Sequence, residues 1–196
     1  MNNSKAKKPA ARNGRAARRR SPAGKRSTQD AIALLKSDHR QVEDWFQQFQ
    51  KARSDARKTE LAARICTALK IHTSIEEEMF YPAFIEATGD KDLHHEAEVE
   101  HEGAKRLIAD IEKSGPEDDY YDAKVKVLSE MIKHHVKEEE KRGGMFAKAR
   151  QSDMDLKSLG EQLAQRKQEL MGAPGGKNMP RRAPAARAGT RATPMP

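Results

Sequence analysis

Apolar residues recur every three or four positions through most of this chain, which is the spacing of one buried face of an α-helix. Five segments carry the pattern, and they are about 28–52, 56–87, 92–113, 119–141 and 154–171. The first four are similar in length and joined by short connections, so the sequence predicts an all-α fold, an up-down-up-down four-helix bundle. The apolar stripe of the fifth segment is weaker, and we expect an extra C-terminal helix outside the bundle.

Polar residues interrupt these apolar stripes at positions that face the predicted interior of the bundle. The six residues are His39, His72, Glu76, His101, His135 and Glu139. The first and third segments each contribute a lone histidine that follows an acid, and the second and fourth each contribute a His-x-x-x-Glu. The two halves of the bundle therefore repeat one arrangement, as expected for a duplicated helical hairpin.

The repeated arrangement predicts a metal site. Residues four apart on a helix lie on one face about 6 Å apart, so each His-x-x-x-Glu can present an imidazole and a carboxylate to the same ions. Such donors, without thiolates, suit iron, manganese or zinc. Six protein ligands are too many for a tetrahedral zinc and fit two octahedral ions with bridging carboxylates and an open position. One histidine in an apolar stripe is more often a hydrogen-bonded core residue, but two buried carboxylates need a compensating cation.

Other polar residues near these positions are interpreted differently. The acids that turn away from the histidines are expected on solvated faces, with a supporting contact to a ligand as the alternative: Glu77, Glu78, Glu138 and Glu140. Three further histidines are expected at the surface: His94, His95 and His134. For Trp45 and Tyr81 we expect packing alone, and the alternative is that they shield the site.

Charge divides the chain into three parts. The overall net charge of +8 comes from the ends, because no acid occurs before Asp30 or after Gly172 while Lys and Arg are frequent there. Residues 28–171 are then an acidic domain between disordered basic tails, 1–27 and 172–196. The tails could bind nucleic acid without sequence readout, by counterion release. Alternatively, they are solubilising extensions or arms that fold back on the acidic domain.

The remaining composition concerns the cellular compartment. Cys66 is the one cysteine, so an intramolecular disulfide is excluded and a reducing compartment is favoured. The sequence contains no apolar run long enough for a transmembrane helix and no apolar core of a secretory signal. We therefore expect a cytoplasmic protein without a membrane partner.

The sequence resembles the hemerythrin-like HHE cation-binding domain family across residues 28–171. The motifs that carry the resemblance are Asp38-His39, His72-x-x-x-Glu76-Glu77 followed by Phe80-Tyr81-Pro82, Glu98-Val-Glu-His101, and His134-His135-x-x-Glu138-Glu139. The resemblance implies a four-helix bundle around two non-haem iron ions, oxo- or hydroxo-bridged. It also implies that the four histidines are terminal ligands and the two glutamates bridge the irons; these residues are His39, His72, His101, His135, Glu76 and Glu139.

Two departures limit the resemblance. Oxygen-carrying hemerythrins have a fifth histidine four residues from another on the third helix, but Ala97 and Lys105 stand four residues from His101. Their last carboxylate also comes one residue later, where Glu140 could take its place, and Glu98 could offer a further oxygen ligand. The site therefore resembles redox, nitric-oxide or iron-handling members more than oxygen carriers.

The second departure follows Glu140, where Lys141-Arg-Gly-Gly-Met-Phe-Ala147 replaces a compact Phe-Pro turn. Gly143 and Gly144 are expected to fray or bend the end of the fourth helix. This change leaves His135 and Glu139 in place, but it leaves open how well this end of the bundle is closed and therefore how far solvent reaches the site.

Three functions are open on the sequence. The favoured one is a di-iron protein that binds or senses dioxygen, peroxide or nitric oxide, in stress protection or iron handling. The second is a di-iron redox enzyme that turns over peroxide or nitric oxide; cluster repair is disfavoured because Cys66 is alone. The third is a DNA-associated stress protein that uses its basic tails. A binding or sensing role is preferred to an enzyme because no substrate pocket or second acid–base pair can be named.

Overall fold

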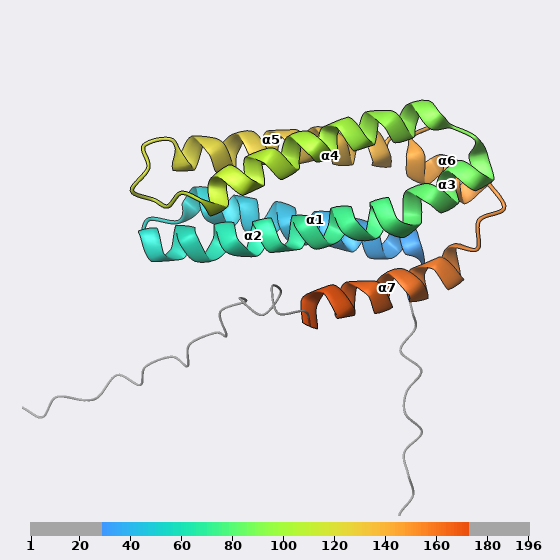
Figure 1. The fold of residues 1–196 in the computed structure, drawn as a ribbon, viewed down its shortest axis with the longest axis horizontal. Coiled ribbons are helices and arrows are strands. Elements are labelled where there is room, and N and C mark those ends of the chain that lie inside the picture. The colour runs from blue at the N-terminus through green and yellow to red at the C-terminus, as the bar shows by residue number, and fades with distance from the viewer. Residues whose placement is uncertain (1–28, 173–196) are drawn as a thin grey trace, which may run out of the picture.

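The computed structural model describes residues 29–172, and all regular elements in that range are helical. The elements are α1 (Ala31–Lys51), α2 (Asp55–Ile75), the π-helix η1 (Glu76–Phe80), α3 (Tyr81–Thr88), α4 (Lys91–Glu112), α5 (Tyr121–Glu140), α6 (Met145–Gln151) and α7 (Leu156–Gly172). Figure 1 shows α1, α2, α4 and α5 side by side in alternating directions, with α7 along the outside. The predicted all-α bundle with an extra C-terminal helix is confirmed.

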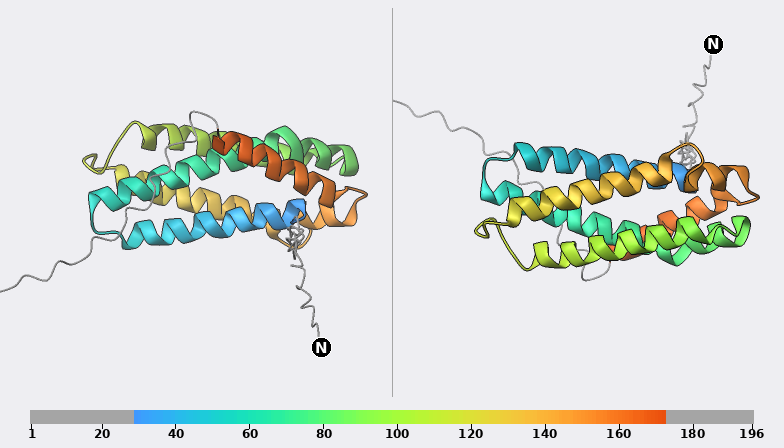
Figure 2. Two further views of the ribbon diagram at one scale, coloured as in Figure 1. Left: turned by 90° about the horizontal axis from the view of Figure 1, so that it is seen from below. Right: turned by 90° about the horizontal axis from the view of Figure 1, so that it is seen from above.

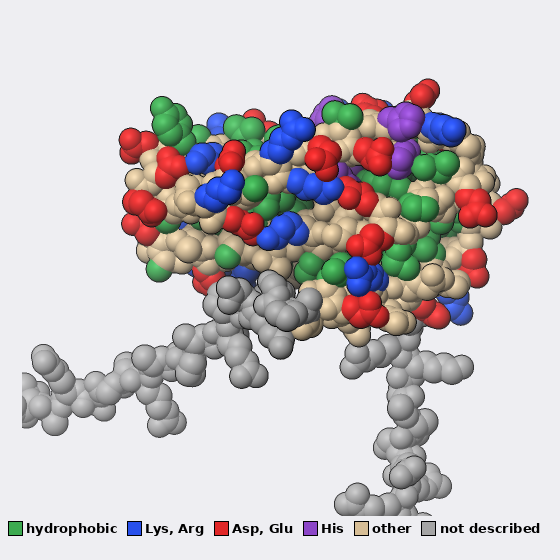
Figure 3. Space-filling view, in the orientation of Figure 1, with side chains coloured by type: hydrophobic (Ala, Val, Ile, Leu, Met, Phe, Trp, Pro, Cys, Tyr) green, Lys and Arg blue, Asp and Glu red, His purple; other side chains and the backbone are tan. Residues whose placement is uncertain are grey.

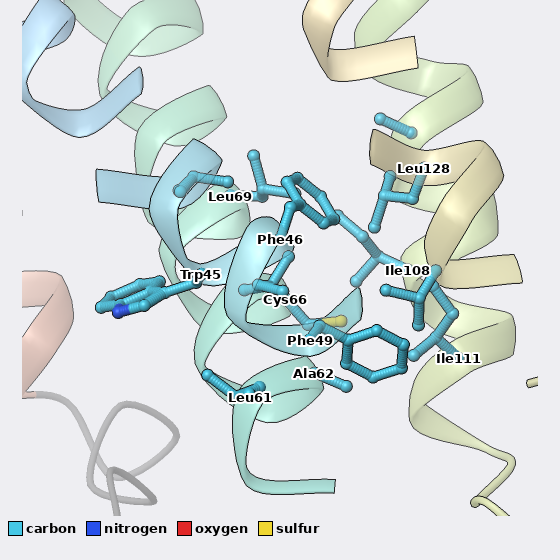
Figure 4. Packing of buried hydrophobic residues seen from close by; sticks show 14 of the residues in the cluster. Trp45, Phe46, Phe49, Leu61, Ala62, Cys66, Leu69, Ile108, Ile111 and Leu128 are labelled. Carbon is cyan, nitrogen blue, oxygen red and sulfur yellow. The ribbon is translucent and has the colours of Figure 1, made fainter. Parts of the chain in front are cut away.

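The interior consists of two apolar clusters with a polar layer between them. One cluster surrounds Phe46, Phe49 and Leu128, and Figure 4 shows Phe46 and Phe49 of α1 pointing toward the helices that carry Leu128 and Ile111. The other surrounds Phe80 and Phe146 near the opposite end. Within α1, for example, Leu35 belongs to the second cluster and Val42 to the first, and His39 lies between them. The six candidate ligands therefore lie in the middle of the bundle, away from both ends.

The outer faces of the helices are polar, as their amphipathic pattern predicts. Acidic and basic side chains are interspersed over the face shown in Figure 3. No helix within residues 29–172 combines the length and hydrophobicity needed to cross a bilayer. The predicted tails, 1–27 and 172–196, fall outside the described range except for Gly172, so their disorder and nucleic-acid contact stay predictions.

The second predicted helix is not continuous. Its α-helical part ends at Ile75, a π-helical turn follows, and α3 begins at Tyr81. Pro82 has no N–H to donate to the carbonyl four residues earlier, which weakens the α-helical pattern here. The N–H of Tyr81 instead bonds the carbonyl of Glu76, five residues back. That spacing places Tyr81 on the same face as Glu76, and both side chains are fully buried.

The end of the bundle beyond α5, whose closure the sequence left open, is closed. The chain turns through Gly143, whose φ is +81°, and continues into the short helix α6. Met145, Phe146 and Ala149 of α6 are buried in the second apolar cluster. The two glycines do end the helix, but the turn they allow returns apolar side chains to the core.

Candidate metal centre

The six predicted residues converge on one buried point. Each side chain is at most 5% exposed. His39 of α1 and His72 of α2 place their Nε2 atoms 3.0 Å apart. His101 of α4 and His135 of α5 place theirs 3.2 Å apart. Two pairs of imidazoles, one from each predicted hairpin, therefore face one another across the bundle.

The two glutamates link these histidine pairs. Glu76 Oε2 lies 3.2 Å from His72 Nε2 and 3.5 Å from His101 Nε2. Glu139 Oε2 lies 3.4 Å from His39 Nε2 and 3.6 Å from His135 Nε2. Each carboxylate thus contacts one histidine of its own helix and one of the other pair. Two groups of potential ligating atoms result, one of His39, His72 and Glu76 and one of Glu76, His101 and His135, each within 4.8 Å.

The electrostatics of the centre suit a cation. Glu76 is 0% exposed, and neither of its carboxylate oxygens has a hydrogen-bond partner. Burial, and then the nearby charge of Glu139, raise the pKa of Glu76 well above its ordinary value. Burial also lowers the pKa of His39, His72 and His101, which favours neutral imidazoles with a free lone pair. An unpaired buried carboxylate beside neutral imidazoles is a costly arrangement without a metal ion and a favourable one with it.

A carboxylate stands behind each histidine, at Nδ1. The pairs are His135 with Glu100 at 2.7 Å, His39 with Glu140 at 2.9 Å, His101 with Glu77 at 2.9 Å, and His72 with Asp38 at the longer distance of 3.7 Å. Where the Nδ1 atom donates a proton to its acid, the Nε2 atom is left free to ligate a metal, and the ring is fixed in orientation. For His135, burial acts to lower the pKa, but Glu139 and Glu100 outweigh it and raise the pKa.

These acids are where the sequence interpretation needs correction. Glu77 and Glu140 were expected on solvated faces, but they contact His101 and His39. The hydrogen bond from His101 lowers the pKa of Glu77 to about 2. Glu140 also accepts two hydrogen bonds from Arg40, at 2.9 and 2.8 Å, so it stands behind His39 rather than among the six. The sequence did contain a sign of this role, because Glu77 directly follows Glu76 and Glu140 directly follows Glu139.

The other acids and histidines lie away from the centre. Glu78 is exposed and pairs with Arg166, and Glu138 pairs with Lys141. Glu98 is also exposed, and its nearest histidine is His94 at 3.5 Å rather than His101. His95 and His134 are exposed, as expected, whereas His94 is half-buried with its ring 5.6 Å from that of Tyr81.

Two aromatic residues contact the six, and one of them is Tyr81, for which packing alone was expected. The hydroxyl of Tyr81 donates to Glu139 Oε1 at 3.3 Å and lies 3.2 Å from His101 Nε2. Burial, and then the charge of Glu76, raise the pKa of Tyr81, so this hydroxyl keeps its proton. Phe146 of α6 stacks on the ring of His39, with centroids 5.8 Å apart. Trp45, in contrast, belongs to the apolar cluster of Figure 4.

This geometry, with paired histidine and glutamate side chains at the centre of a helical bundle, is suited to a metal-binding protein. The model of the Hemerythrin HHE cation binding domain family matches residues 30–146, and the chain belongs to this family, as the sequence motifs predicted. It is therefore a metal-binding domain of a kind that generally takes iron.

The fold is similar to the crystal structure of a Hemerythrin HHE cation binding domain-containing protein from Mycobacterium kansasii. The TM-score is 0.58 at 20% sequence identity, over 74% of this chain and 88% of that chain. At this identity the likeness concerns the fold alone. A search of curated proteins gave no significant match.

Proposed function

We propose that the six residues hold two non-haem iron ions, with Glu76 and Glu139 as bridging ligands. His39 and His72 would bind one ion, and His101 and His135 the other. The observation that carries the proposal is Glu76, a fully buried carboxylate without a hydrogen bond, between two imidazole nitrogens at 3.2 and 3.5 Å. Imidazole and carboxylate donors without a thiolate favour iron over copper(I) or an iron–sulfur cluster.

The proposed ligand is a small oxidant: dioxygen, peroxide or nitric oxide. Iron held by these six residues would supply reversible binding of such a molecule and one-electron chemistry. The protein supplies the surroundings of the site. The neutral hydroxyl of Tyr81 donates to Glu139 and orients that carboxylate, and the two apolar clusters exclude bulk water. A groove of about 230 Å³ between α1 and α5 is lined by His39 and Glu140 and offers a small molecule a route.

Binding or sensing is favoured over turnover by the state of the polar groups. Turnover of peroxide requires a group that gives and regains protons at the centre. The Tyr81 hydroxyl already donates to Glu139, and its raised pKa holds the proton in place. The acids behind the histidines are themselves hydrogen-bonded or ion-paired. A redox enzyme that acts on peroxide or nitric oxide is the alternative.

Elemental analysis of anaerobically purified protein tests the proposal, with optical spectra before and after dioxygen or nitric oxide. We expect two iron ions per chain and a spectrum that responds to the gas. Glu76→Gln should reduce the content to one ion or none, whereas the exposed Glu98→Gln should leave it unchanged. Zinc at one ion per chain, or equal losses in both variants, would refute the assignment. Under excess oxidant, a sensor saturates stoichiometrically and an enzyme cycles.

A further inference from the structure

Helix α7 lies outside the segment matched by the family, residues 30–146, yet it packs against α1 and α2. In the left view of Figure 2 it lies at the front of the bundle. The first turns of α7 lie close to the backbone just before α1. A Cβ added at Gly160 would lie 2.4 Å from the carbonyl oxygen of Gln29, so only glycine fits. Leu159 and Leu163 are buried beside it. The contact fixes the register of α7 along the bundle.

The second half of α7 carries two basic residues that reach the neighbourhood of the metal centre. Arg166 donates to both carboxylate oxygens of Glu78 in η1, at 2.7 and 3.2 Å. Lys167 forms an ion pair with Oδ1 of Asp38 in α1. The Arg166 pair is exposed and contributes little stability. The Lys167 pair differs because Asp38 is only 9% exposed.

Asp38 makes one of the four histidine positions different from the other three. Glu100, Glu140 and Glu77 lie 2.7 to 2.9 Å from the Nδ1 atoms that they face. Asp38 Oδ2 lies 3.7 Å from His72 Nδ1, beyond a direct hydrogen bond. Neither Asp38 Oδ2 nor His72 Nδ1 has a hydrogen-bond partner, although both are buried. The carboxylate is thus oriented toward His72 by the lysine that holds its other oxygen.

We propose that α7, through Lys167 and Asp38, sets how tightly the metal ion at the His39 and His72 position is held. This inference rests on the proposed function, because it concerns one of the two proposed ions. Lys167 is a positioning residue: it contacts no ligand and acts through the acid behind His72. Acids behind ligating histidines typically contribute 10- to 100-fold to metal affinity. The His101 and His135 position has its own acids, Glu77 and Glu100, and does not depend on α7.

The surroundings of Asp38 explain why loss of Lys167 would weaken metal binding. A cavity of about 70 Å³ between α1, α2 and α7 is lined by Asp38 and Lys167, by apolar side chains such as Val42 and Trp45, and by Gln41, Arg64 and Thr67. Without the lysine, the carboxylate would keep a buried charge beside a mostly apolar space. It can lower this cost by rotating away from His72. The imidazole would then lose the carboxylate that faces its Nδ1 atom at 3.7 Å, and with it the negative charge that supports its binding of a metal ion.

The test is the rate at which iron-loaded full-length protein releases iron(II) to an excess of chelator, followed optically. Lys167→Met should release one of the two ions roughly 10- to 100-fold faster, with the second ion at the wild-type rate. Lys167→Arg, which keeps the ion pair, should restore slow release. Lys157→Met, a change at an exposed position of the same helix, should have no effect. Arg166→Met should also have none, since it leaves Asp38 and Lys167 paired.

A second variant distinguishes the proposed effect on metal release from a general loss of stability. Asp38→Asn should give the same fast phase, and the double variant with Lys167→Met should be no faster than either alone. If Lys167→Met releases both ions at the wild-type rate, or loosens both equally, the role of α7 is refuted while the proposed function stands. Wild-type protein that takes up no second ion would refute the proposed function, and this inference with it.

Discussion

Glu76→Gln should stabilise the metal-free protein and weaken its response to iron. Glu76 is fully buried, neither oxygen accepts a hydrogen bond, and Glu139 adds a second carboxylate to the same layer. An unsatisfied buried polar group costs about 1–3 kcal/mol, and more if charged. Glutamine has nearly the same shape, carries no charge, and can donate its amide N–H to the neutral His72 imidazole, whose Nε2 lies 3.2 Å from Glu76 Oε2. The metal-free variant should therefore be more stable by about 1–3 kcal/mol, roughly 2 to 12 °C in Tm for a chain of this size.

With iron the order of stability should reverse. A ligand that binds only the folded state stabilises it by about 2.7 kcal/mol at one hundred times Kd for each site. The wild-type chain gains this at two positions, whereas the variant lacks a bridging carboxylate and gains less. Thermal unfolding followed by circular dichroism, first after dialysis against a chelator and then with anaerobic iron(II), measures both effects. Glu98→Gln is the control, because Glu98 is exposed.

One result would refute this reasoning directly. If metal-free Glu76→Gln unfolds at a lower temperature than metal-free wild-type protein, the carboxylate stabilises the empty bundle. Its burial would then need no cation, and the observation that carries the di-iron proposal would lose its force.

Three further predictions concern other parts of the chain. Glu77→Gln should weaken metal binding at the His101 position by about 10- to 100-fold in a competition titration, because Glu77 faces His101 Nδ1 at 2.9 Å; an unchanged affinity would contradict its supporting role. Gly144→Ala should destabilise the fold by about 1–3 kcal/mol in urea unfolding, because a Cβ there would lie 2.3 Å from the Glu138 carbonyl oxygen; a neutral result would mean that α6 shifts freely. Cys66 is buried, and burial raises its pKa to about 12, so iodoacetamide at pH 8 should label it only after unfolding; rapid labelling of folded protein, read by mass spectrometry, would show that this end of the bundle opens.

The sequence was sufficient for the bundle and for the convergence of the six inner residues. Helical spacing decides which residues share a face, and His72 and Glu76 follow it directly. Whether the six bind iron stays a proposal. The spacing of residues could not show which acid faces which histidine. Glu100, for example, belongs to α4 and stands next to His101, yet it contacts His135 of α5. Such pairs depend on how neighbouring helices are rotated and offset.

Two local features also lay beyond the periodic pattern. The π-helical turn after Ile75 adds one residue to a turn, so Tyr81 faces the centre although a regular α-helix would rotate it away. The short helix α6 has too few residues to show a period, and its glycines indicated fraying. Its apolar residues are buried because the turn at Gly143 returns the chain to the core, which no local pattern records.

The polar layer between the two apolar clusters also affects how the empty bundle would open. Most helical bundles fray from their ends, where the fewest side chains are buried. Here the ends are packed by Phe49 and Phe146, and the least favourable burial lies in the middle, around Glu76. Without metal, amide hydrogen exchange should therefore be fastest beside the histidines and slower toward the ends. Bound metal would then hold the two separately packed halves together at mid-length, so that they would unfold as one cooperative unit.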